Sequence, residues 1–67
     1  MEYSNSRVRE IIGEYIHDEK HRRLMIRRMI DNVTIERLSE EFELSVSQVK
    51  RIIWKNMEIV YRHLKAD

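Results

Sequence analysis

The chain has 67 residues, enough for one small domain and no more, and it has no cysteine, which excludes a disulfide framework and a thiolate zinc site. No apolar stretch has the length of a signal peptide or a membrane span, so we expect a soluble, cytoplasmic protein with no membrane partner. The net charge of +1 does not by itself indicate a nucleic-acid partner. The chain has no proline and only one glycine, Gly13, which disfavours sheet-rich folds with many turns. The composition therefore predicts an all-α fold. The pattern along the chain predicts one small domain of four helices spanning residues 1–67.

The first helix is predicted over about residues 6–16, with Asn5 or Ser6 as its N-cap. Its apolar residues recur at helical spacing and form one stripe: Val8, Ile11, Ile12, Tyr15 and Ile16. This stripe is expected to face the core.

Asp18 is suited to cap a second helix that runs to about residue 30. The apolar residues of this helix cover more than one of its sides: Leu24, Met25, Ile26, Met29 and Ile30. Such a helix is either central in the bundle or partly buried by another chain. Asp31 and Asn32 form a reasonable stop, because Asn tolerates the left-handed conformation.

Thr34 is the expected N-cap of a third helix, whose apolar face is made by Ile35, Leu38 and Phe42. Ser45 and Gln48 then have the spacing of a capping box, which starts a fourth helix at Val46. Leu44 and Val49 are spaced as a hydrophobic staple across the same turn.

The fourth helix is predicted to be long, over residues 46–65. One side is apolar and is expected to pack on the first two helices: Val49, Ile52, Ile53, Met57, Val60 and Leu64. The opposite side is polar: Ser47, Gln48, Arg51, Lys55, Glu58 and Arg62. Trp54, Ile59 and Tyr61 widen the apolar arc, which suggests a second protein surface and leaves homodimerisation open.

Charges are distributed unevenly along the chain. Two basic clusters flank an acidic segment at residues 31–43. The cluster before this segment consists of Lys20, Arg22, Arg23, Arg27 and Arg28. The cluster after it consists of Lys50, Arg51, Lys55, Arg62 and Lys65. A duplex responds only to charges within about one Debye length, ~8–10 Å, so a near-neutral protein can still present a basic face. The alternative interpretation is the ordinary solvated surface of a small helical protein.

Two helices joined by a tight turn at about residues 34–55 have the pattern of a helix-turn-helix, which predicts binding to double-stranded DNA. The second of these helices is the expected recognition helix in the major groove. Ser47, Gln48 and Arg51 are the candidate base contacts, because Gln suits adenine and Arg suits guanine. The candidate phosphate contacts are Lys50, Lys55, Arg22 and Arg23.

The segment TIERLSEEFELSVSQVKRI, residues 34–52, resembles region 4 of the bacterial sigma-70 factors. The resemblance implies an all-helical domain that reads promoter DNA and contacts RNA polymerase. Glu43 stands where many such motifs carry glycine, and Val46 stands where the family usually has a basic residue. Because nothing in the chain corresponds to region 2, the resemblance implies a small free-standing transcription regulator of the kind found in phages and mobile elements.

Other site types find little support in the sequence. His17 and His21 lie four residues apart, but no third strong ligand is fixed by spacing, so no metal site is expected. A polar histidine packed beside Tyr15 or Arg22 is the preferred interpretation. The chain shows no convincing nucleophile, base and acid set and no glycine-rich phosphate loop, so we expect neither an enzyme nor a cofactor.

The main rival interpretation is a protein-interaction module that binds RNA polymerase or a sigma factor without strong DNA binding of its own. Its contact surface would be the acidic side of the third helix, formed by Glu36, Glu40, Glu41 and Glu43. Replacing Arg51 with Glu separates the two hypotheses, because it should abolish DNA binding and spare a partner that uses the acidic helix.

Overall fold

The computed structural model describes residues 4–65, which form four α-helices. These are α1 (Asn5–Tyr15), α2 (Glu19–Met29), α3 (Ile35–Phe42) and α4 (Val46–Lys65). The all-α, four-helix prediction is confirmed. None of these helices is long and apolar enough to cross a membrane.

Capping side chains explain where the first three helices begin. Asp18 accepts a hydrogen bond from the His21 backbone N–H at 3.1 Å, and Thr34 accepts one from the Arg37 N–H at 3.2 Å, as predicted. The predicted N-cap of α1 was wrong by one or two residues, because Ser4 is the N-cap and accepts from the Arg7 N–H at 3.1 Å. The helix therefore includes residues 5 and 6, which were the predicted caps.

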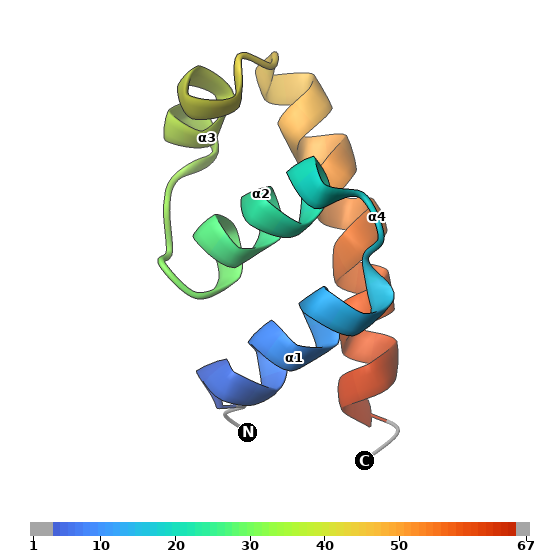
Figure 1. Cartoon of the computed structure of the whole chain (residues 1–67). Coiled ribbons are helices and arrows are strands. Elements are labelled where there is room, and N and C mark those ends of the chain that lie inside the picture. The colour runs from blue at the N-terminus through green and yellow to red at the C-terminus, as the bar shows by residue number, and fades with distance from the viewer. Residues whose placement is uncertain (1–3, 66–67) are drawn as a thin grey trace.

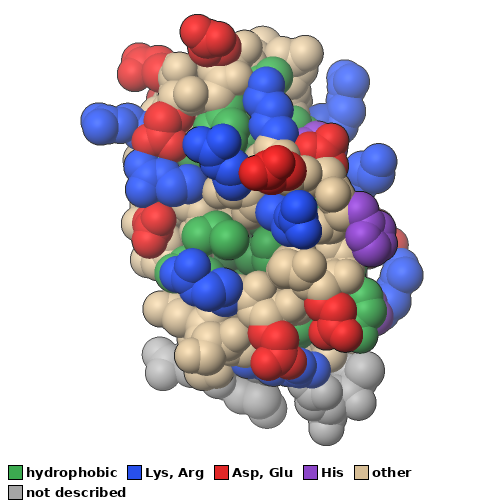
Figure 2. Space-filling model, in the orientation of Figure 1, with side chains coloured by type: hydrophobic (Ala, Val, Ile, Leu, Met, Phe, Trp, Pro, Cys, Tyr) green, Lys and Arg blue, Asp and Glu red, His purple; other side chains and the backbone are tan. Residues whose placement is uncertain are grey.

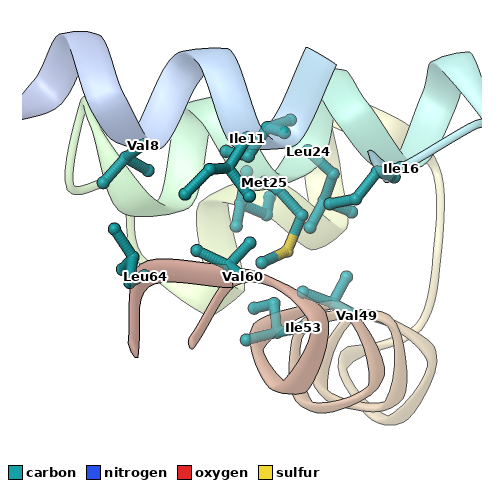
Figure 3. Packing of buried hydrophobic residues seen from close by; sticks show 11 residues of the cluster. Val8, Ile11, Ile16, Leu24, Met25, Val49, Ile53, Val60 and Leu64 are labelled. Atoms are coloured by element: carbon teal, nitrogen blue, oxygen red, sulfur yellow. The ribbon is translucent and has the colours of Figure 1, made fainter. Parts of the chain in front are cut away.

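Helix α2 lies centrally in the bundle, which is one of the two alternatives left by its wide apolar surface. It contacts α1, α3 and α4, whereas α1 and α3 do not contact each other within residues 4–65. Figure 3 shows Met25 of α2 pointing toward Val49 and Ile53 of α4, while Val8 and Ile11 of α1 lie over Leu64 and Val60. The buried apolar cluster is Val8, Ile11, Ile12, Ile16, Leu24, Met25, Leu38, Val49, Ile53, Val60 and Leu64.

Two residues depart from the predicted apolar pattern. Asn56 of α4 lies in the buried stripe with only 3% of its surface exposed, and its Nδ2 donates to the Ile52 carbonyl at 2.8 Å. Tyr15 was predicted to face the core but is 38% exposed, and its ring stacks on His63 with a centroid distance of 3.5 Å. His63, and neither His17 nor His21, is therefore the histidine that packs on Tyr15.

Figure 1 shows how α4 runs along the length of the molecule, whose extents are 34 × 20 × 16 Å. Helix α3 and the first turns of α4 form one end. The start of α1 and the last turn of α4 both lie at the opposite end (Figure 1). The candidate site of the sequence analysis is thus well separated from both ends of the described chain.

Candidate nucleic-acid interface

The turn between α3 and α4 is fixed by hydrogen bonds on both sides. Glu43 adopts the left-handed conformation (φ 56°, ψ 46°), and its N–H donates to the Glu40 carbonyl at 3.4 Å. The Leu44 N–H donates to the Ser39 carbonyl at 3.0 Å, which completes a Schellman motif. In return, the Ser39 hydroxyl donates to the Leu44 carbonyl at 2.6 Å, a contact that the sequence did not indicate.

The capping box at the start of α4 is confirmed. The Ser45 N–H donates to Gln48 Oε1 at 2.9 Å, and the Gln48 N–H donates to Ser45 Oγ at 3.1 Å. Leu44 packs against the buried cluster, of which Val49 is a member. Together, the Schellman motif and the capping box fix the angle between α3 and α4.

Replacing Glu43 with Gly is expected to stabilise the fold by about 0.5–1 kcal/mol, because glycine adopts a positive φ without the clash that Cβ creates. Urea unfolding followed by circular dichroism measures the change. Glu40→Gly is the matched control and should destabilise by about 1 kcal/mol, because Glu40 lies within α3. A loss of stability in the Glu43 variant would contradict the argument that the positive φ of Glu43 destabilises the fold.

The first turns of α4 present a polar, basic surface. Ser47, Gln48, Lys50, Arg51 and Lys55 are all exposed. Within residues 4–65, the side chains of the three cations make no hydrogen bond or ion pair. These charges are therefore available for an external partner.

These residues fall into three stripes, because successive residues on an α-helix are about 100° apart around its axis. Ser47 and Arg51 lie along the middle of the exposed side, opposite the buried stripe. Lys50 lies on one flank, whereas Gln48 and Lys55 lie on the other. The structure thus brings all five predicted α4 residues to one end of one helix, but it separates them by direction.

Gln48 has a structural role that limits its predicted contact with adenine. Its Oε1 already accepts the Ser45 N–H, so a bidentate contact with a base would require this oxygen to accept a second hydrogen bond or to leave the cap. Nε2 has no partner among the described residues and can still donate. Gln48 lies on the flank rather than in the middle stripe of the exposed side of α4.

The basic cluster of α2 is only partly available. Arg27 binds Glu41 through two parallel hydrogen bonds, one of them Nε to Oε2 at 3.0 Å, and its Nη1 donates to Asp31 at 3.2 Å. The Arg27 guanidinium holds the pKa of Glu41 below its ordinary value. Arg28 Nη1 donates to the Val33 carbonyl at 2.9 Å. The Arg27–Glu41 ion pair therefore links α2 to α3, and the Arg28 hydrogen bond links α2 to the segment before α3.

The remaining cations of α2 lie in different places. Arg23 is exposed and, with Lys20, lines a groove beside Phe42 and Glu43, next to the turn before α4. Arg22 is half-buried and does not line this groove. Figure 2 shows basic and acidic side chains intermixed on the face drawn there, rather than one continuous basic patch. Of the α2 residues predicted to contact phosphate, only Arg23 stands beside the turn.

A second, smaller groove runs between α2, the start of α3 and the middle of α4. Its lining is Arg28, Met29, Asn32, Ile35, Ile53, Trp54, Met57 and Tyr61. Trp54 and Tyr61 belong to one flank of α4, seven residues apart, whereas Ile59 lies on the other flank and does not line the groove. The three residues suggested as a dimer surface therefore do not form one patch.

Among residues 4–65, no group of three His, Asp or Glu side chains is placed to hold a metal ion. No protein-family model matches the chain, and neither a curated protein nor a solved structure was found to match it.

Proposed function

We propose that this chain is a sequence-specific double-stranded DNA-binding domain that regulates transcription. In this proposal α3, the turn at residues 43–45 and α4 act as a helix-turn-helix, and α4 enters the major groove with its N-terminal turns. The supporting observation is the exposed surface on those turns, whose three cations lack partners among the described residues, on a helix held at a fixed angle.

Each residue has a role that follows from its direction on α4. Ser47 and Arg51, in the middle stripe, contact base edges, with Arg51 suited to guanine O6 and N7. Gln48 contributes a donor through Nε2 while it keeps its cap. The phosphate contacts are assigned to Lys50, Lys55, Arg23 and, less directly placed, Arg22.

The proposal extends to the class of regulator. The resemblance of residues 34–52 to sigma-70 region 4 suggests a free-standing, phage-related cytoplasmic regulator that acts on promoter DNA. RNA polymerase is then a candidate second partner.

The test is selection from a randomised duplex pool at low and moderate salt, with the wild type beside the Lys50→Ala, Arg51→Ala double variant. We expect the wild type to enrich one sequence motif and the double variant to lose it. Palindromy in the motif would indicate that two copies bind together. Failure of the wild type to bind duplex DNA even at low salt would refute the proposal, since electrostatic attraction to phosphate is then strongest.

A protein-interaction module remains the second candidate, because Glu36, Glu40 and Glu43 of the acidic helix are exposed and unpaired within residues 4–65. Glu41 was predicted to belong to this surface, but its carboxylate is paired with Arg27. Glu40→Lys should weaken a partner that uses this helix and leave DNA affinity unchanged or higher. The opposite pattern is expected for Arg51→Glu.

A further inference from the structure

Trp54 is the most exposed large hydrophobic residue of the described chain, at 70%, compared with 44% for Tyr61. Its indole N–H has no hydrogen-bond partner within residues 4–65. Single exposed apolar residues are common on protein surfaces and need no explanation by themselves. The position of Trp54 on α4 is what makes it informative.

Trp54 lies on the basic end of α4. It follows Lys50 by four residues and Arg51 by three, so both cations are its neighbours one turn away. It follows Ser47 by seven residues, which places it about 10 Å farther along the helix axis. Around the axis, Trp54 lies about 20° from Ser47 and about 40° from Lys50, and all three lie on the same side of Arg51.

The dimensions of the major groove indicate what this flank would meet. The groove is about 12 Å wide and about 8.5 Å deep. When the first turn of α4 reaches base edges, a side chain about 10 Å farther along the axis lies at the groove edge, where the sugars and phosphates are. Trp54 then faces one wall of the groove, and Lys55 faces the other.

We propose that the Trp54 flank of α4 is a contact surface for the sugar-phosphate backbone of duplex DNA, which rests on the DNA-binding function proposed above. The indole ring packs on a deoxyribose, its Nε1–H donates to a phosphate oxygen, and Lys50 binds an adjacent phosphate. The aromatic ring supplies a large, rigid contact surface, and the N–H supplies a hydrogen-bond donor. Because the side chain is neutral, this contact releases no additional counterion from the DNA.

The C-terminal limit of this surface is also visible. Glu58 is exposed, follows Trp54 by one turn and pairs with Arg62 at 3.5 Å. A carboxylate close to phosphates is repelled by them, so the DNA-facing part of α4 ends before Glu58. Tyr61 lies on the Trp54 flank but about 10 Å farther along, beyond the groove edge.

The experiment uses the full chain, in which Trp54 is the only tryptophan. Its fluorescence is titrated with the duplex selected from the randomised pool, and anisotropy of the labelled duplex is measured in parallel. We expect a change in tryptophan emission that saturates at the same midpoint as the anisotropy.

Variants separate the parts of the contact. Trp54→Ala is expected to lose about tenfold in affinity, and Trp54→Phe, which keeps a ring but lacks the N–H, should lose less. Tyr61→Ala is the matched control and should bind as the wild type does. Since Trp54 carries no charge, the slope of log affinity against log salt should not change, whereas Lys50→Ala should reduce it by about 0.9. Circular dichroism should show unchanged melting of the Trp54 variants, because the side chain is exposed.

The outcomes distinguish this inference from the proposed function. If the wild type binds DNA and Trp54→Ala binds equally well, or tryptophan emission does not respond, the Trp54 contact is refuted while DNA binding stands. If emission shifts to the blue with rising protein concentration in the absence of DNA, a second copy covers Trp54 and the inference is also overturned. If the wild type does not bind DNA at all, both proposals fail together.

Discussion

Replacing Arg51 with Glu is expected to reduce affinity for the selected duplex by more than about 2 kcal/mol, roughly thirtyfold or more. Truncation of a base-contacting arginine alone costs about 1–3 kcal/mol. The new carboxylate adds repulsion from the phosphates that surround the groove. Arg51 is exposed and unpaired within residues 4–65, so the folded state should tolerate the change. Anisotropy of a labelled duplex measures the loss.

Arg62→Glu is the matched control for this charge reversal. Arg62 lies on the same helix, eleven residues beyond Arg51, and its side chain is exposed. The change in net charge is identical, so a nonspecific effect of charge would weaken both variants equally. If the first turns of α4 contact the bases, Arg51→Glu should lose much more affinity for the duplex than Arg62→Glu. Comparable losses would contradict the assignment of the middle stripe of α4.

Replacing Leu38 with Ala is expected to destabilise the fold by about 2–5 kcal/mol. Leu38 is fully buried and is the one residue of α3 with no exposed surface. A domain of this size has a total free energy of unfolding of only about 3–10 kcal/mol. The variant should therefore be largely or partly unfolded at 25 °C, and thermal or urea unfolding followed by circular dichroism measures this.

Val46→Ala is the control for the loss of an aliphatic side chain. Val46 is exposed at the first position of α4, so its truncation should change stability by no more than about 0.5 kcal/mol. A Leu38 variant as stable as the Val46 variant would show that α3 does not depend on its buried contact. In that case the fixed angle between α3 and α4 would rest on the turn alone.

Helix starts were the most predictable part of this fold. Asp18, Thr34 and Ser45 each stand alone as strong capping residues before an apolar pattern, and each caps the helix expected of it. The start of α1 was less certain because Ser4, Asn5 and Ser6 are all good caps. Local sequence does not decide among three adjacent caps, and the packing of the helix decides instead.

Contacts between distant residues were not predictable in the same way. Arg27 and Glu41 are fourteen residues apart, so their pairing, which removes one cation and one anion from the predicted surfaces, depends on how α2 meets α3. Asn56 was overlooked because an apolar-pattern search skips a polar residue, although it has the spacing of the buried stripe. The grouping of Trp54 with Ile59 ignored the direction of each residue around the helix.

The sequence predicted which residues belong to the candidate site better than how these residues are arranged. The sequence indicated which α4 side chains would be exposed, because the apolar stripe leaves them outside. The predicted capping box already engaged Gln48 in the cap, as the hydrogen bonds confirm. The sequence did not show that Arg23 lies beside the turn while Arg22 does not. That difference arises from the placement of α2, which helical periodicity alone does not specify.

The first turn of α1 and the last turn of α4 both lie at the end of the molecule farthest from the α3–α4 turn (Figure 1). Two copies joined through these ends by a flexible linker would keep both α4 N-termini free. Half-sites one helical turn apart are separated by about 34 Å, which exceeds the two shorter extents of the molecule, 20 and 16 Å. Such a tandem would raise the local concentration of the second copy, and the gain in avidity would depend on linker length rather than on any new contact.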